Sequence, residues 1–156
     1  YTVNIDEAFV DMGPIHRFTL RVGKFRQRFG IVNAKRVNEV PYIDRPLIYQ
    51  QAFGGVLNEV AVSFLYRMSF LPWVSEFSEQ FFTPTNPTLF GGTSNATNIG
   101  GTFYWRNEFP LSSASQLVLD LGSIYGTNTY GAGSHVYEAG LTFKTERFKW
   151  ANDYLY

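Results

Sequence analysis

The sequence has 156 residues, enough for one domain with a sizeable core, and we treat residues 1–156 as a single domain. Lys plus Arg and Asp plus Glu number 13 each, so no bulk charge indicates a nucleic-acid partner. The absence of Cys excludes disulfides, thiolate zinc sites and cysteine nucleophiles. No run of about 18 apolar residues occurs, which excludes a transmembrane helix.

Apolar and polar residues alternate with a period of two along most of the chain, and helical periodicity is almost absent. The clearest segment is 58–70, whose even positions are large and apolar and whose odd positions are small or charged, apart from Leu65. The same alternation predicts about eight strands. They lie at roughly 2–12, 16–29, 58–70, 73–82, 102–109, 116–122, 137–144 and 148–156.

The connections between these strands alternate between short and long. Short turns are expected at 12–15, 71–73, 110–115 and 145–148. Long connections span 30–57, 83–101 and 127–133. Short turns on one side and long loops on the other are typical of an antiparallel transmembrane β-barrel, with the turns in the periplasm and the loops outside the cell.

Alternation by itself does not say which face of the sheet meets water. In a soluble β-sandwich the apolar face is buried, whereas in a membrane barrel it meets lipid and the polar face lines the lumen. Aromatic residues near strand ends favour the barrel, because they would form girdles at the membrane interfaces. These residues are Phe70, Trp73, Phe81, Phe82, Phe103 and Phe109. A soluble β-sandwich that binds a ligand stays open as an alternative.

One strand, residues 16–29, is unusually basic. Arg17 and Arg21 have one parity, and Lys24, Arg26 and Arg28 have the other. A β-bulge at Gly23 and Lys24 would bring all five to the lumen side, because glycine tolerates the bulged geometry. The predicted result is a basic wall along the pore.

Two interpretations of this wall compete. The cations attract anions into a pore, or they pair with carboxylates across the lumen, which the equal charge totals favour. The pore-lining carboxylates that we predict are Glu59, Glu108, Asp120, Glu138 and Asp153. Arg67, Arg106 and Lys144 stand at polar positions of the strands and are also predicted to line the pore.

The segment "LRVGKFRQRFG", followed by "VPYIDRPLIYQQAFGG", resembles the strand and loop of phosphate-selective porin-like outer-membrane proteins. The tail "YEAGLTFKTERFKWANDYLY" is similar to later strand pairs of such barrels. This resemblance implies location in the outer membrane of a Gram-negative bacterium and passive diffusion of small solutes, anions among them. Barrels of that family are considerably longer than this chain.

The lengths of the turns also indicate whether the eight strands form a complete barrel. They place both ends of the chain on the side of the long loops, and an open sheet edge cannot persist in lipid. We therefore expect the eight strands to be a segment of a larger barrel, or to be completed by another segment or chain. A closed eight-stranded barrel is the alternative.

No catalytic constellation is present, so we expect neither enzymatic activity nor a cofactor. His16 and His135 are the only histidines and lack metal-ligand spacing. In the first long loop, Lys35, Arg36, Asp44 and Arg45 are candidates for a constriction in the lumen or for a partner surface. A scaffolding barrel whose loops bind a protein partner, or a second copy of the chain, is therefore a further hypothesis beside the porin.

Overall fold

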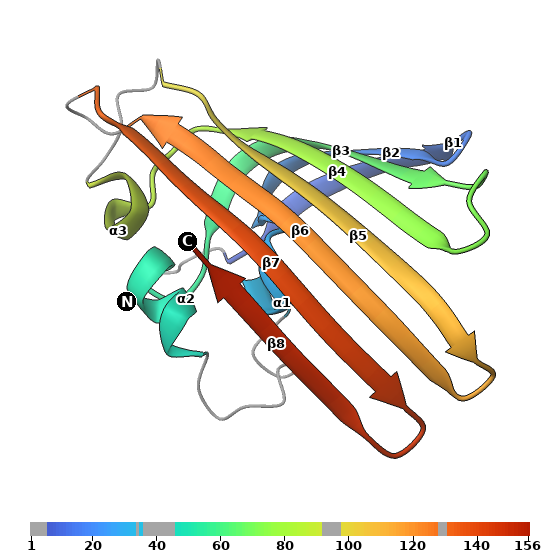
Figure 1. Ribbon diagram of the computed structural model, residues 1–156. Coiled ribbons are helices and arrows are strands. Elements are labelled where there is room, and N and C mark those ends of the chain that lie inside the picture. The colour runs from blue at the N-terminus through green and yellow to red at the C-terminus, as the bar shows by residue number, and fades with distance from the viewer. Residues whose placement is uncertain (1–5, 34, 36–45, 92–97, 128–130) are drawn as a thin grey trace.

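The computed structural model describes residues 6–33, 35, 46–91, 98–127 and 131–156. Eight antiparallel strands form one sheet in chain order, which confirms the predicted all-β fold (Figure 1). The strands are β1 (Ala8–Ile15), β2 (Phe18–Arg26), β3 (Asn58–Met68), β4 (Val74–Phe82), β5 (Gly100–Ser112), β6 (Ser115–Thr127), β7 (Gly133–Thr145) and β8 (Lys149–Leu155).

The first hairpin turns later than the sequence suggested. Strand β1 continues through the expected turn at 12–15, with a register irregularity between Met12 and Ile15. The turn is made by His16 and Arg17, both with positive φ (49° and 72°). Positive φ at both central residues is the geometry of the tight turn whose twist matches that of a hairpin.

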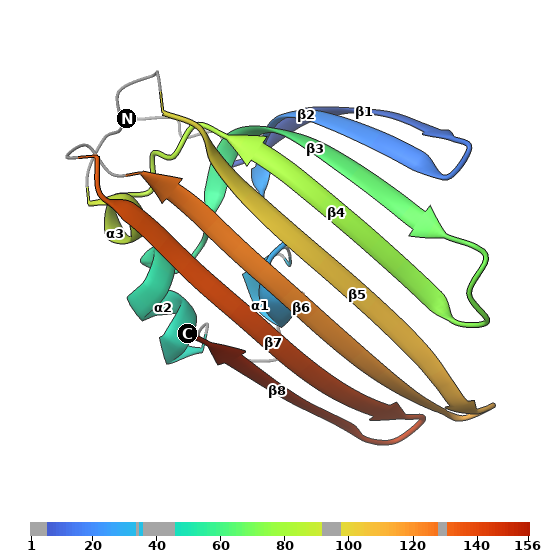
Figure 2. The ribbon, with the colours of Figure 1, turned by 45° about the horizontal axis from the view of Figure 1, so that its top comes forward.

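The sheet is strongly curved, and its short turns and long connections lie at opposite ends (Figures 1 and 2). Three short helices belong to the long connections: α1 (Gly30–Asn33), α2 (Leu47–Phe53) and α3 (Pro87–Phe90). They lie on the concave side of the sheet (Figure 2). None of the helices in the described segments is long and apolar enough to cross a membrane.

The concave face is polar and the convex face is apolar. On β3, Glu59 is 1% exposed while its neighbour Val60 is 61% exposed. On β7, Glu138 is 4% exposed and Tyr137 is 55% exposed. This inverts the arrangement of a water-soluble sheet, which turns its apolar face to a core, and it matches the wall of a membrane barrel. The described strands form one sheet, so they do not form the two-sheet sandwich of the alternative hypothesis.

Strands β1 and β8 are the two edges of the sheet and do not pair with each other. The closed eight-stranded barrel is therefore not formed by the described residues. The sheet is open and curved (Figure 2). Together with its polar concave face and apolar convex face, this is the arrangement of a segment of barrel wall.

An apolar cluster fills the concavity near the long connections. Rings from the helices and from the chain after β2 pack there, with Phe29 against Phe53 at 5.7 Å between ring centroids. Phe82, which we expected in an interfacial girdle, is 3% exposed and packs against Phe90 in this cluster. Phe82 lies two residues after Gln80 on β4, so both side chains point to the concave face. The buried members are Phe25, Phe29, Val32, Tyr49, Phe53, Leu57, Ala61, Phe82, Phe90 and Ile124.

The bulge expected at Gly23 is absent. Around Gly23 the register of β2 runs without a shift along both neighbouring strands, with Gly23 opposite Phe9 on one side and Ala61 on the other. Glycine is needed here for another reason: its φ is 138°, and an added Cβ would lie 2.3 Å from the carbonyl oxygen of Ala8. Gly23 thus allows close approach of β1 rather than a change of parity.

Candidate functional site: a charged cavity on the concave face

The chain that leaves β2 crosses the concave face of the sheet. We call residues 27–33 the lumen segment; it includes α1. Gln80 of β4 holds its start, since the Arg28 N–H donates to Oε1 (3.0 Å) and Nε2 donates to the Arg28 carbonyl (3.1 Å). Further along, the Ile31 N–H donates to Oδ2 of Asp153 on β8 (3.2 Å). The segment therefore spans the wall from β4 to β8.

Glycines on the wall make room for this crossing. A Cβ on Gly122 would lie 3.0 Å from the ring of Phe29, and one on Gly140 would lie 3.1 Å from Ile31. Small residues let the lumen segment approach the backbone of β6 and β7 closely.

Asn33 fixes the far end of the lumen segment. Its Nδ2 donates to the carbonyls of Gln27 (2.8 Å) and Leu57 (3.0 Å), and its Oδ1 accepts from the Leu57 N–H (2.9 Å). The side chain is fully buried. These bonds tie α1 to the residue just before β3, and they satisfy backbone groups that would otherwise be buried without partners.

Beneath the lumen segment, six cross-strand neighbours form one row over β3 to β8. The register places each residue opposite the next, and charges of opposite sign alternate in the first four positions. Because neighbouring strands are close, such opposite charges attract one another directly. The row runs Arg67, Glu76, Arg106, Asp120, Gly140 and Asp153.

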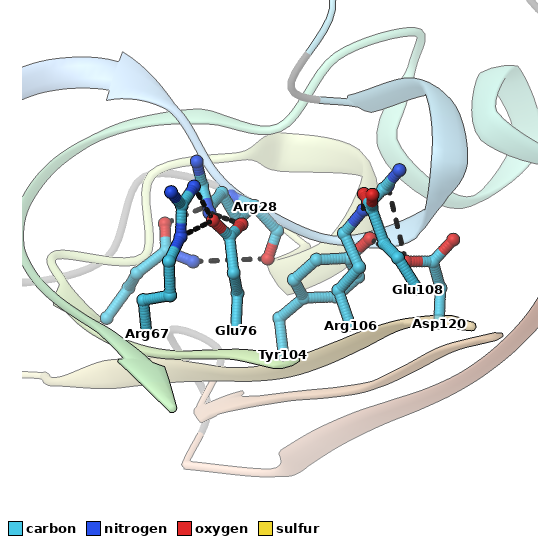
Figure 3. A network of polar contacts seen from close by, with 8 residues as sticks. Arg28, Arg67, Glu76, Tyr104, Arg106, Glu108 and Asp120 are labelled. Carbon is cyan, nitrogen blue, oxygen red and sulfur yellow. Dashed lines mark hydrogen bonds and ion pairs between the residues drawn. The ribbon is translucent and has the colours of Figure 1, made fainter. Parts of the chain in front are cut away.

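Two ion-pair groups occupy this row (Figure 3). Glu76 accepts from Nε of Arg67 at 2.9 Å, and Nη1 of Arg28 lies 3.4 Å from its other oxygen. Arg106 donates through Nε to Glu108 at 2.7 Å and lies 3.5 Å from Asp120. Arg28 thus meets a wall carboxylate from the lumen segment, so loop and sheet share one charge network.

A cavity of about 380 Å³ lies between the lumen segment and this row. Arg28 and Lys35 line it from the loop side, and Arg67 and Arg106 line it from the wall. The carboxylates of its lining are Glu76 and Glu108, with Tyr104 beside them. Cations therefore outnumber carboxylates two to one around the cavity.

Lys35 adds to the positive character of this region. Its pKa lies below the usual lysine value, first because burial penalises the charged amine and then because Lys149, Arg106 and Lys144 repel it. The smaller part of this lowering shows that three other cations lie near Lys35.

Two tyrosines seal the acidic end of the row. Tyr104 donates to Oδ1 of Asp120 at 2.5 Å, and Tyr49 of α2 donates to Oδ2 of Asp153. Burial, and then the charge of Asp153, raise the pKa of Tyr49, so its hydroxyl stays a donor. This bond anchors α2 to β8.

The five residues of the predicted basic wall do not form one ladder. Arg17 lies in the first turn, where its carbonyl accepts from the Arg67 N–H. Arg21 makes a two-point bond with Asp11 (2.6 and 2.8 Å) on the concave side. Without the bulge, Lys24 pairs with Val60 and keeps the parity of the convex face.

The last two residues of that set lie at the end of β2 and beyond it. Arg26 is buried, and its guanidinium donates to Asp6 (2.5 Å) and to the carbonyl of Lys35 (2.7 Å). Arg28 has left the sheet and lines the cavity. Of the predicted basic wall, Arg28 alone is found at the charged cavity among the described lining residues.

The carboxylates predicted for the lumen all stand on the concave face, in differing surroundings. Glu59 is buried and accepts from Thr85 and from the Asn86 N–H (2.7 Å), which anchors the second long connection. Glu108 borders the cavity, whereas Asp120 and Glu138 are buried beside the lumen segment. Asp153 receives the two donors described above.

Some of the remaining predicted residues lie at the cavity and others do not. Arg67 and Arg106 line the cavity, and Lys144 lies opposite Lys149 and Gln116 nearer the short turns. Arg36, Asp44 and Arg45 fall outside the described residues.

Several residues of the site escaped the sequence analysis: Glu76, Gln80, Tyr104 and Tyr49. The first three share the inward parity of β4 and β5, so strict alternation would have pointed to them. No pattern pointed to Tyr49, because its position depends on how the loop folds. In the described part of the chain, no group of three or more acidic or histidine side chains is arranged to hold a metal ion.

Comparison with known proteins completes this description. No curated protein and no solved structure matches the chain. The family model described as phosphate-selective porin O and P matches residues 1–129, which include β1 to β6 and the whole lumen segment. The chain therefore belongs to the family of phosphate-selective porins O and P, channel proteins of the outer membrane of Gram-negative bacteria.

Proposed function

We propose that this chain contributes the wall and the narrow part of a porin that passes small anions in preference to cations, without covalent chemistry. The observation that carries the proposal is the cavity beneath the lumen segment, where four cations face two carboxylates. Charged side chains that line a pore set its ion selectivity.

The pairing pattern supports selectivity beyond mutual neutralisation. Glu76 is shared by two guanidinium groups, Arg28 and Arg67. Arg106 is matched by its own carboxylates, and Lys35 adds a further positive charge. These residues thus leave a net positive charge beside the cavity. Some of the basic residues pair with carboxylates and the remaining positive charge can attract anions, so both interpretations given for the basic residues apply.

The mechanism follows from solvation. A small anion that enters a narrow passage loses part of its water shell, which raises its free energy. Guanidinium and ammonium groups on the wall offset this loss by charge-assisted hydrogen bonds. Paired carboxylates keep those bonds weak enough for release, and conduction requires such release.

Reversal potentials across planar bilayers under a salt gradient test the proposal. We expect the reconstituted channel to prefer chloride or phosphate over potassium. Arg28→Gln should lower this preference, and the fold should tolerate it because the Arg28 backbone, not its side chain, is held by Gln80. Arg147→Gln, in the exposed turn before β8, is the matched control and should behave as the unaltered channel.

Cation preference in the unaltered channel, or equal effects of the two substitutions, would refute anion selectivity.

One observation favours a second function. The apolar cluster fills the concavity near the long connections, as in a barrel that is plugged and serves as a scaffold. Zero conductance of the reconstituted protein, together with a partner that co-purifies at fixed ratio, would select that function.

A further inference from the structure

Three carboxyl groups from adjacent strands meet under the lumen segment: Asp120 of β6, Glu138 of β7 and Asp153 of β8. Asp120 is fully buried and Glu138 is 4% exposed. Within the described residues, Oδ2 of Asp120, both oxygens of Glu138 and Oδ1 of Asp153 are buried and receive no hydrogen bond from a donor. Buried carboxylate oxygens without donors are costly.

Glycines bring these groups together. A Cβ on Gly140 would lie 2.7 Å from Oε1 of Glu138, and one on Gly122 would lie 3.0 Å from Oε2. The Glu138 carboxyl therefore occupies space that larger residues would fill. Gly140 itself stands between Asp120 and Asp153 in the cross-strand row, so Glu138 lies between two other acids.

Among the described residues, few groups compensate the charges of the cluster. From β5, Arg106 approaches Asp120 at 3.5 Å but also pairs with Glu108, and Tyr104 donates to Asp120. From α2 and α1, the Tyr49 hydroxyl and the Ile31 N–H donate to Asp153.

None of these donors serves Glu138. Its carboxyl lies against Gly140, and Asp153 stands opposite Gly140 on the next strand. Two neighbouring buried carboxylates repel each other, whereas a carboxylate and a carboxylic acid form a strong bond.

We propose that Asp120, Glu138 and Asp153 form a proton-binding site, in which Glu138 and Asp153 share a proton, and that this proton keeps the lumen segment seated on the wall. The seated state needs the proton because, with Ile31 packed over Gly140 and Tyr49 bonded to Asp153, both oxygens of Glu138 and Oδ1 of Asp153 are buried. When the proton leaves, like charges face each other at buried oxygen atoms. Lifting of the lumen segment then admits water to the carboxylates.

The consequence is a passage whose width depends on pH. The lumen segment carries Arg28 and forms one side of the charged cavity. Its release would move that side away from the wall and change conductance. The site requires the barrel fold and does not rest on anion selectivity, so the two proposals fail separately.

Hydrogen exchange of residues 27–33, followed by mass spectrometry between about pH 5 and about pH 9, tests the site in the reconstituted protein. After correction for the intrinsic pH dependence of exchange, we expect the rate to rise about tenfold or more with pH, the effect of one unit of differential pKa. Glu138→Gln supplies a permanent donor to Asp153 and should keep exchange slow throughout. Glu146→Gln, in the exposed turn that follows β7, is the matched control and should retain the pH dependence.

Asp153→Asn provides a second test if the first variant does not fold. Its amide can still accept from Tyr49 and Ile31 and can donate to Glu138, so it should also remove the pH dependence. Exchange that is independent of pH in the unaltered protein, or that keeps its pH dependence in Glu138→Gln, would overturn the proposal. Loss of the pH dependence on addition of calcium chloride would assign the site to a metal cation and overturn it as well.

Discussion

Replacement of Gln80 by Met should detach the start of the lumen segment without changing the volume of the wall. Gln80 is fully buried and makes two hydrogen bonds to the backbone of Arg28, at 3.0 and 3.1 Å. Each bond contributes about 1 kcal/mol net, and leaving the two backbone groups of Arg28 without partners adds to the cost, so we expect a total of about 2–4 kcal/mol. At 1.4 kcal/mol per factor of ten, local opening should become about 30 to about 700 times more frequent.

Hydrogen exchange of residues 27–33 measures this opening directly. Gln116→Met is the matched control, because Gln116 stands on the same concave face but bonds to Glu108 (2.6 Å) and not to the lumen segment. We expect faster exchange in Gln80→Met and unchanged exchange in the control. Equal exchange in Gln80→Met and the unaltered protein would show that the apolar packing of Phe29, not the Gln80 clamp, holds the segment.

Three further predictions concern the same region. Glu76→Gln should raise the anion-to-cation permeability ratio about sevenfold, because removing a unit charge at ~7 Å in a water-like dielectric changes the energies of an anion and of a cation by about 0.6 kcal/mol each, in opposite directions; an unchanged reversal potential would contradict it. The pKa of Lys35 is lowered. As the pH rises, Lys35 should therefore lose its charge, and the channel part of its anion preference, at a lower pH than the one at which an ordinary lysine loses its proton. Reversal potentials of Lys35→Gln should lack this step. Asn33→Ala removes three buried hydrogen bonds and should lower the cost of opening between α1 and β3 by about 2–4 kcal/mol, seen as faster exchange of the Leu57 amide; unchanged exchange would refute it.

The strands, and the sets of residues that share one face of the sheet, were predictable from the sequence alone. Period-two alternation needs only local geometry, because successive side chains of a strand point to opposite faces. It located all eight strands and placed Glu59, Asp120 and Glu138 on the polar face. The family was recognised from short segments for a similar reason, since its strand-and-loop pattern is contiguous in the chain.

The face that meets water was decided by the tertiary structure. The same alternation suits a soluble sandwich and a membrane wall, and the curvature of one open sheet with Val60 outside and Glu59 inside selects the wall. The tertiary structure also decided which face Lys24 points to, because β2 has no bulge at Gly23. A glycine is needed at this position because the backbone of Ala8 on β1 approaches it closely.

The candidate site was beyond local patterns because it joins distant parts of the chain. Arg28 meets Glu76, and Tyr49 meets Asp153, across separations of 48 and 104 residues. No periodicity within a strand specifies where a loop crosses the opposite wall. The sequence determined which residues share a face of the sheet, because strand geometry is local. The folding of residues 27–33 onto the sheet determined which of them surround the cavity, because that depends on packing and hydrogen bonds between segments far apart in the chain.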